Sequence, residues 1–196
     1  MEKLTRDDLW SLEQYAEKRA GFRAEVMAHK KDRQLALDTH ARLYFEDRTT
    51  VHYQIQEMLR IEKVFDRQGI QDELDAYNPL IPDGNNWKAT FMLEYDDVEQ
   101  RREQLAQLRG IEDCVWLQVQ DNERITAVAD EDLERENDEK TSSVHFLRFE
   151  LSTQMIEDLH RGANLRAGID HAAYPQLDIL VPENIRASLI NDLQKQ

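Results

Sequence analysis

The chain has 196 residues, of which 40% are hydrophobic and 33% are charged, a composition typical of a globular protein with an extensive solvated surface. Its 40 acidic residues outnumber the 25 basic ones, and the net charge of −15 disfavours nucleic acid and anionic membranes while favouring basic proteins or metal cations. The single cysteine, Cys114, excludes an internal disulfide framework and a cysteine-rich zinc or iron–sulfur site.

The first half of the chain combines helix-capping signals with short strand patterns. Thr5, followed three residues later by Asp8, resembles a capping box and predicts a long helix over residues 6–30. Two short strands are expected within 34–46. The elements expected next are helices at 49–64 and 68–77, a strand at 87–95 and a helix at 97–109.

The second half of the chain is richer in strand patterns. Alternating apolar residues predict a strand at 114–120, and Asp121 and Asn122 predict a tight turn into 123–129. The segment 130–140 carries seven acidic and two basic side chains, which predicts an acidic, solvated and potentially disordered loop at about 130–142. The remaining elements are expected as a strand at 144–151, a helix at 153–161, strands at 164–171 and 176–181, and a helix at 183–194.

These elements predict an α+β fold with a mixed, mostly antiparallel sheet packed with a long N-terminal helix and several shorter helices. The acidic loop is the best candidate for a domain boundary. The roughly 55 residues that follow it would nevertheless form a thin independent core. We therefore expect residues 1–196 to form a single α+β domain.

The helix expected at 49–64 places a carboxylate, Glu62, on its apolar stripe. The apolar residues at helical spacing are Val51, Ile55, Met58, Leu59 and Phe65. A carboxylate buried there without a partner would cost several kcal/mol. In the simpler interpretation Glu62 reaches solvent or pairs with an arginine. In the functional interpretation Glu62 acts with Glu57 as a metal ligand or as an acid/base group.

The helical spacing also limits the partners available to Glu62. Arg60 lies too far round the helix to be the obvious partner. We expect the partner to come from another element, and Arg148 and His145 in the strand at 144–151 are the first candidates. A contact between Glu62 and either residue would identify a polar site on this helix.

Two histidines occur at positions that alternate with apolar strand residues. His145 precedes Leu147 and Phe149, and His171 follows Ile169, so both are expected to face an apolar side. A histidine in that position is more often a satisfied core residue than a ligand. The helix between the two strands suggests a parallel crossover, which would separate the histidines by about 20 Å. The two would converge only if the strands were antiparallel.

No motif in the sequence fixes a reaction. Glu157 and His160 form a single Glu-x-x-His pair, whereas a di-iron carboxylate bundle needs two. The chain lacks a His-Glu-x-x-His motif, a P-loop, a dinucleotide-binding glycine pattern and a Gly-x-Ser-x-Gly elbow. Cys114 follows Glu112 and Asp113, whose negative charge raises a thiol pKa, so it is interpreted as structural. The sequence therefore requires no cofactor, although it is compatible with a bound metal.

Three stretches together resemble a known bacterial family. They are YQIQEMLRIE at 53–62, SVHFLRF at 143–149 and IDHAAY at 169–174, and KLTRDDL at 3–9 is similar too. Over essentially its whole length the chain resembles the family called domain of unknown function 3501. A proline is expected after the Asp-His pair of that family, and Ala172 stands there in this chain.

The resemblance implies a cellular context rather than a reaction. Members of that family are often encoded beside a rubrerythrin and an iron–sulfur oxidoreductase of the heterodisulfide-reductase type, which implies redox or peroxide-stress work. The family offers no settled catalytic residues to transfer. The resemblance and the patterns above direct attention to a candidate polar set: Glu57, Arg60, Glu62, His145, Arg148, Asp170, His171 and Tyr174.

Two functional hypotheses follow. The first is a non-catalytic accessory or assembly protein of a redox or peroxide-stress system, with rubrerythrin or the iron–sulfur oxidoreductase as its protein partner. The second is a small metal-binding protein or metal-dependent enzyme that uses Glu57, Glu62 and either His145 or His171 around one pocket. The amphipathic helices are also compatible with a homo-oligomer. Because no apolar signal core or membrane span is evident, we expect a soluble, cytoplasmic protein.

Overall fold

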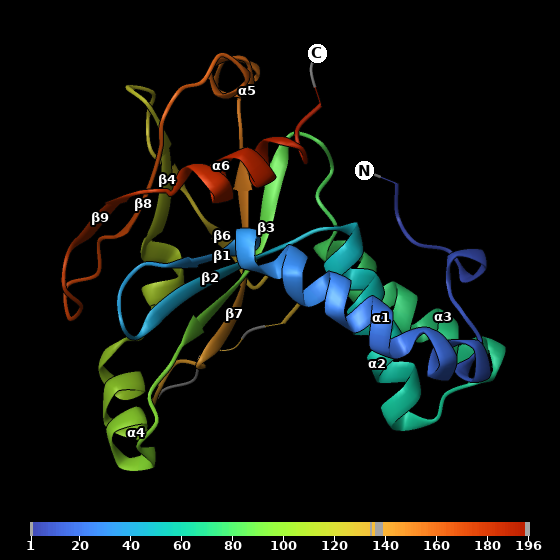
Figure 1. Cartoon of the computed structure of the whole chain (residues 1–196). Helices are drawn as coiled ribbons and strands as arrows, with labels where there is room; N and C mark the ends of the chain where they lie inside the picture. Colours follow the sequence, from blue (N-terminus) through green and yellow to red (C-terminus); the bar gives the residue numbers. More distant parts are fainter. Residues whose placement is uncertain (1, 134, 136–138, 195–196) are drawn as a thin grey trace.

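The computed structural model describes residues 2–133, 135 and 139–194 and has an α+β architecture (Figure 1). The fold class predicted from the sequence is confirmed. The strands form two sheets rather than one, here called sheet A and sheet B. All the strand pairings among the described residues are antiparallel.

Sheet A has the strand order β1-β2-β3-β7-β6. Its strands are β1 (Gln34–Ala36), β2 (Ala41–Glu46), β3 (Asn86–Leu93), β6 (Val128–Ala129) and β7 (Val144–Glu150). The register pairs Phe91 with His145 and Thr90 with Phe146. Because successive side chains of a strand point to opposite faces, His145 lies on the buried face of β7 and Phe146 on its outer face.

Sheet B has the strand order β5-β4-β8-β9 and packs its apolar face into the same core as sheet A. Its strands are β4 (Val115–Val119), β5 (Ile125–Thr126), β8 (Leu165–Ile169) and β9 (Leu177–Leu180). Only Ala127 separates β5 from β6, and its N–H donates to the carbonyl oxygen of Val115 at 2.9 Å. This short run therefore carries the chain from sheet B to sheet A, as corner strands do in packed-sheet folds.

The parallel crossover expected between the strands at 144–151 and 164–171 does not form. β7 belongs to sheet A and β8 to sheet B, with α5 (Thr153–His160) between them along the chain. The alternation of apolar residues indicates that a strand is half buried, but it does not say which sheet the strand joins. The separation of about 20 Å expected between His145 and His171 assumed parallel pairing at ~3.3 Å per residue, so it does not apply to this fold.

The three helices α1 (Leu12–Lys30), α2 (Arg48–Glu62) and α3 (Arg67–Tyr77) lie together on one side of the sheets (Figure 1). They enclose a second, smaller core that consists of Leu4, Val51, Ile55, Leu59, Leu74 and Ile81. The other α-helices are α4 (Val98–Gln107) and α6 (Glu183–Ile190), and the 3-10 turns are η1 (Arg6–Asp8), η2 (Lys31–Arg33), η3 (Asn78–Leu80) and η4 (Ile111–Cys114). No helix in the described part of the chain is long and apolar enough to cross a bilayer.

The first long helix begins at Leu12 rather than at residue 6. The predicted capping box of Thr5 and Asp8 is present, since the Asp8 carboxylate accepts from the Thr5 N–H at 2.8 Å, but it caps only the short turn η1. Ser11 and Gln14 form a second capping box that starts α1. Two capping signals in succession therefore divide what looked like one helix.

The acidic segment expected at 130–142 makes specific contacts where the structure describes it. Arg135 lies 3.0 Å from Asp130 and 2.6 Å from Asp132, and Thr141 is buried. Asp132 is exposed, as a solvated loop requires, whereas Asp130, Arg135 and Thr141 are largely covered. Residues 134 and 136–138 lie outside the described residues, and the expectation of disorder falls partly on them.

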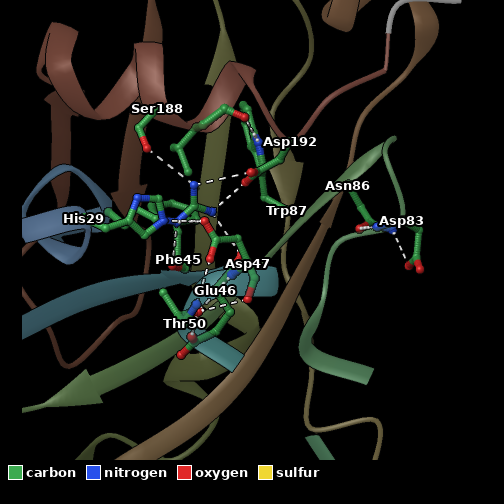
Figure 2. Close-up of polar contacts among 12 residues, drawn as sticks. His29, Phe45, Glu46, Asp47, Thr50, Asp83, Asn86, Trp87, Ser188 and Asp192 are labelled. Carbon is green, nitrogen blue, oxygen red and sulfur yellow. Dashed lines mark hydrogen bonds and ion pairs between the residues drawn. The ribbon is translucent and has the colours of Figure 1, made fainter. Parts of the chain in front are cut away.

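A buried ionic cluster joins the N-terminal helices to sheet A and the C-terminal segment (Figure 2). Arg33, at the end of η2, donates to the carbonyl oxygen of Phe45 at 3.0 Å and to Asp192 at 2.6 Å. Asp47, the N-cap of α2, lies 3.4 Å from the Arg33 Nε and 2.5 Å from the Nε2 of His29. This cluster fixes the helices α1 and α2 against the sheets that carry the candidate site.

Candidate functional site on the two faces of β7

Glu62 is exposed rather than buried on the apolar stripe of α2. Val51 and Ile55 are buried as the spacing predicted, but α2 ends at Glu62, and Lys63 adopts a left-handed conformation with a φ of 55°. The chain therefore leaves the packed face at this point, and Phe65 is 81% exposed. The structure agrees with the simpler interpretation, in which Glu62 reaches solvent at the helix end.

Glu57 is held between α1 and α2 by three side chains. Its carboxylate accepts from the Tyr15 hydroxyl at 2.7 Å, from Arg19 at 2.7 and 2.9 Å, and from Arg60 at 3.0 Å. The Arg19 guanidinium holds the pKa of Glu57 well below its usual range, while burial raises the pKa of Tyr15. Because both carboxylate oxygens are already engaged, Glu57 links α2 to Tyr15 and Arg19 of α1, and Arg60 supports it from its own helix.

The stretch at 169–174 forms a turn beyond β8 rather than a continuing strand. His171 is half-exposed, and its Nε2 lies 2.9 Å from the carbonyl oxygen of Arg109. The prediction that His171 faces an apolar core is wrong, because the strand ends two residues earlier. Asp170 is exposed, whereas Tyr174 is buried and donates to Asp38 at 2.9 Å. Burial and this carboxylate raise the pKa of Tyr174.

His145 is completely buried, as its place in the strand pattern predicted, and it lies within a polar cluster. Its Nδ1 lies 2.6 Å from an oxygen of Asp130. Its Nε2 lies 3.0 Å from the Thr141 hydroxyl, 3.0 Å from the Ser142 carbonyl oxygen and 3.7 Å from an oxygen of Glu112. Both ring nitrogens therefore face oxygen atoms inside the core.

The described residues contain one group of three carboxylate or imidazole side chains whose ligand atoms lie within 4.8 Å of one another: Glu112, Asp130 and His145. Of these, only His145 was in the predicted set. Glu57 and Glu62 lie on α2 and do not join this group. No local signal distinguished Glu112 or Asp130, because the group forms only when η4, the end of β6 and β7 meet.

The opposite face of β7 lines a groove with a cavity volume of about 650 Å³. Its floor includes Phe146 and Arg148 on the outer face of sheet A, and its wall is the segment from the end of α3 through η3. Tyr77 and Leu80 contribute apolar surface to that wall. The charged residues of the lining are Asp75, Asp83, Lys88, Glu131, Asp132, Arg148 and Glu150.

Consecutive residues connect the buried cluster to the groove. Asp130 contacts His145 inside the core, and the next residue, Glu131, accepts from Arg148 at 2.7 and 2.8 Å on the outer face. Arg148 also pairs with Glu150. The contact between Arg148 and Glu62 that we expected from the sequence is not formed. A change that displaces this acidic segment would therefore affect both faces of β7 together.

A family model described as "Protein of unknown function (DUF3501)" matches residues 3–193. The chain belongs to this family. A crystal structure of a novel protein of unknown function from Burkholderia pseudomallei K96243 is 54% identical to this DUF3501 chain, with a TM-score of 0.94. The match covers 98% of this chain and 100% of that one. No curated protein matches the chain. The family resemblance inferred from the sequence stretches is thus confirmed.

Proposed function

We propose that this DUF3501 protein is a non-catalytic accessory or assembly protein of a cytoplasmic redox or peroxide-stress system. It holds a segment of a protein partner in the groove between α3 and the outer face of sheet A. The groove supports this proposal, because its volume of about 650 Å³ lies within the range of about 300–1,000 Å³ that ligand-binding clefts occupy.

The charges of the groove favour a partner segment that contains lysine or arginine. Five carboxylates and two cations, Lys88 and Arg148, line it, and the whole chain carries a net charge of −15. Four of these carboxylates already have cationic partners: Glu131 and Glu150 pair with Arg148, Asp83 with Lys3 and Lys88, and Asp132 with Arg135. The charge left to attract a basic segment is therefore mainly that of Asp75. The exposed parts of Tyr77 and Phe146 suit an apolar side chain between the basic ones.

The redox context and the two candidate partners, rubrerythrin and the iron–sulfur oxidoreductase, are supported by the family resemblance. The test is direct binding of each purified, untagged partner to this protein, measured by calorimetry. We expect Phe146→Glu and Asp75→Lys to weaken binding at least tenfold. The matched controls are Val98→Glu and Glu103→Lys, which change exposed residues of α4, away from α3 (Figure 1).

Two outcomes would contradict the proposal. The first is that neither partner associates with the wild-type protein and that deletion of the gene leaves peroxide tolerance intact. The second is that the groove variants and the α4 variants bind equally well, which would place the interface elsewhere. Circular dichroism of each variant separates a lost interface from a lost fold.

A further inference from the structure

Three buried or half-buried groups converge on the Nε2 atom of His145. The Thr141 hydroxyl and the Ser142 carbonyl oxygen each lie 3.0 Å from it, and the nearer Glu112 oxygen lies 3.7 Å away. The Thr141 hydroxyl is also 3.3 Å from that Glu112 oxygen. Glu112, Thr141 and His145 are 7%, 1% and 0% exposed, so water is largely excluded from their contacts.

If His145 is neutral, this cluster has fewer hydrogen-bond donors than acceptors. Asp130 accepts at Nδ1, which leaves a lone pair on Nε2. The Thr141 hydroxyl then offers one hydrogen to two acceptors, Nε2 and the Glu112 carboxylate. The unprotonated Nε2 donates nothing to the Ser142 carbonyl oxygen that lies 3.0 Å from it. A buried carboxylate without adequate donors costs several kcal/mol, so either a cation or a second ring proton must stabilise it.

The spacing of these atoms is that of ligands around one small cation. Nitrogen and oxygen ligands bind such ions at about 2.0–2.2 Å, which puts neighbouring ligand atoms about 3.0–3.5 Å apart. The observed separations run from 3.0 Å to 3.7 Å. Of these separations, only the one between Nε2 and Glu112 exceeds that range.

Asp130 occupies the position of the carboxylate that orients a metal-binding imidazole. Its Oδ2 lies 2.6 Å from Nδ1 of His145, and its Oδ1 accepts from the Phe146 N–H at 2.9 Å and from Arg135 at 3.0 Å. These bonds fix the carboxylate and the ring, and they direct Nε2 toward Glu112. Carboxylate–histidine–metal arrangements use the same geometry to set the tautomer and raise ligand basicity.

We propose that His145 and Glu112, with the neutral oxygens of Thr141 and Ser142, form a buried site for one divalent first-row metal ion. One imidazole and several oxygens, without a thiolate, suit manganese, iron(II) or zinc better than copper(I) or magnesium. This inference uses the inner face of β7 and does not depend on partner binding in the groove.

The test uses full-length protein prepared without a His-tag, treated with a chelator and titrated separately with Mn²⁺ and Zn²⁺ by calorimetry. We expect one ion per chain for at least one of the two. Glu112→Gln, which keeps the side-chain shape, should weaken binding at least tenfold. The control His171→Gln removes an imidazole outside the cluster and should leave the affinity unchanged.

¹⁵N NMR of the histidines in the wild-type protein provides a readout that does not depend on a variant folding. Metal binding should shift the Nε2 signal of His145 while Nδ1 stays protonated. The proposal is overturned if neither ion binds at one per chain or if Glu112→Gln binds as tightly as wild type. It is also overturned if both His145 nitrogens remain protonated in the presence of the ion, because the ring proton then stabilises Glu112.

Discussion

Arg33 and Asp192 form a two-bond ion pair in the interior, although 159 residues separate them along the chain. The bonds measure 2.6 and 3.3 Å, and each side chain is 2% exposed. Arg33 also donates to the carbonyl oxygens of Phe45 and Glu46 at 3.0 Å each. The pair therefore attaches the C-terminal segment to β2 and to η2, the turn that follows α1.

Removing the cation alone should be strongly destabilising. We expect Arg33→Met to lower the free energy of unfolding by about 3–5 kcal/mol at pH 7, because the Asp192 carboxylate stays buried without its partner. Urea denaturation followed by circular dichroism measures the change. The double variant Arg33→Met/Asp192→Leu should recover much of the loss, since an apolar pair replaces the ionic one. Additive losses in the two single variants and the double variant would mean that the residues are not coupled.

Asp192 should also make stability depend on pH. Burial raises the pKa of Asp192 from 3.8 to about 6, with a smaller upward effect from Asp47, while Arg33 acts in the opposite direction. The folded state therefore keeps a proton between about pH 4 and 6 that the unfolded state releases. The stability that Asp192 contributes is therefore present below its unfolded pKa of 3.8 and is lost as the pH rises to about 6.

Asp192→Asn removes this titration and keeps the shape of the side chain. Between pH 4 and 7 the difference in unfolding free energy should shift by about 2.4 kcal/mol in favour of the Asn variant, at 1.36 kcal/mol per pKa unit. Urea titrations of both proteins at pH 4, 5, 6 and 7 provide the measurement. A constant difference, or a shift in favour of wild type, would show that Arg33 outweighs burial in setting the pKa.

The sequence was sufficient to predict features that depend on neighbouring residues. The capping box of Thr5 and Asp8, the burial of Ile55 and His145 and most of the order of helices and strands follow from local spacing. The element expected at 123–129 is instead divided into β5 and β6, which belong to different sheets. The sequence left open whether Glu62 is buried, because periodicity does not reveal that a left-handed residue ends the helix immediately after it.

The candidate site could be predicted only in part, because its members come from separate elements. Alternation placed His145 in the core, yet its partners Asp130 and Glu112 lie 15 and 33 residues earlier in the sequence. They meet His145 only because the run from β5 to β6 passes between the two sheets. Such contacts depend on tertiary packing, for which a single sequence gives no spacing rule.

The two acidic residues of α2 should differ sharply when each is neutralised. Glu57→Gln weakens three charge-assisted or hydroxyl contacts between α1 and α2 and should cost about 1–3 kcal/mol at pH 7. Glu62→Gln changes an exposed side chain of the same helix and should stay within about 0.5 kcal/mol of wild type. Urea denaturation compares the two, and equal effects would contradict the structural role of Glu57.

The same pair of variants gives a pH test. Since Arg19 depresses the pKa of folded Glu57 below its value of 4.5 in an unfolded chain, its contribution is present above about pH 4.5 and is lost as the pH falls. The stability gap between wild type and Glu57→Gln should therefore narrow from pH 6 to pH 3. Glu62→Gln, measured in parallel, serves as the control for neutralising an acid on the same helix. A widening gap for Glu57→Gln would reverse the assigned sign.

Two glycines should respond oppositely to alanine. In sheet B, a Cβ on Gly168 would lie 2.0 Å from the Leu177 carbonyl oxygen and 2.3 Å from the Trp116 ring, so backbone must move. Gly168→Ala should cost about 3 kcal/mol or more and lower the Tm by about 6–12 °C. Gly21 lies within α1, where a Cβ meets nothing within 4 Å, so Gly21→Ala should raise the Tm by about 1–4 °C through the helix propensity of alanine. Differential scanning calorimetry measures both, and a Tm for Gly168→Ala near that of wild type would mean that β8 and β9 are not packed as closely as the register requires.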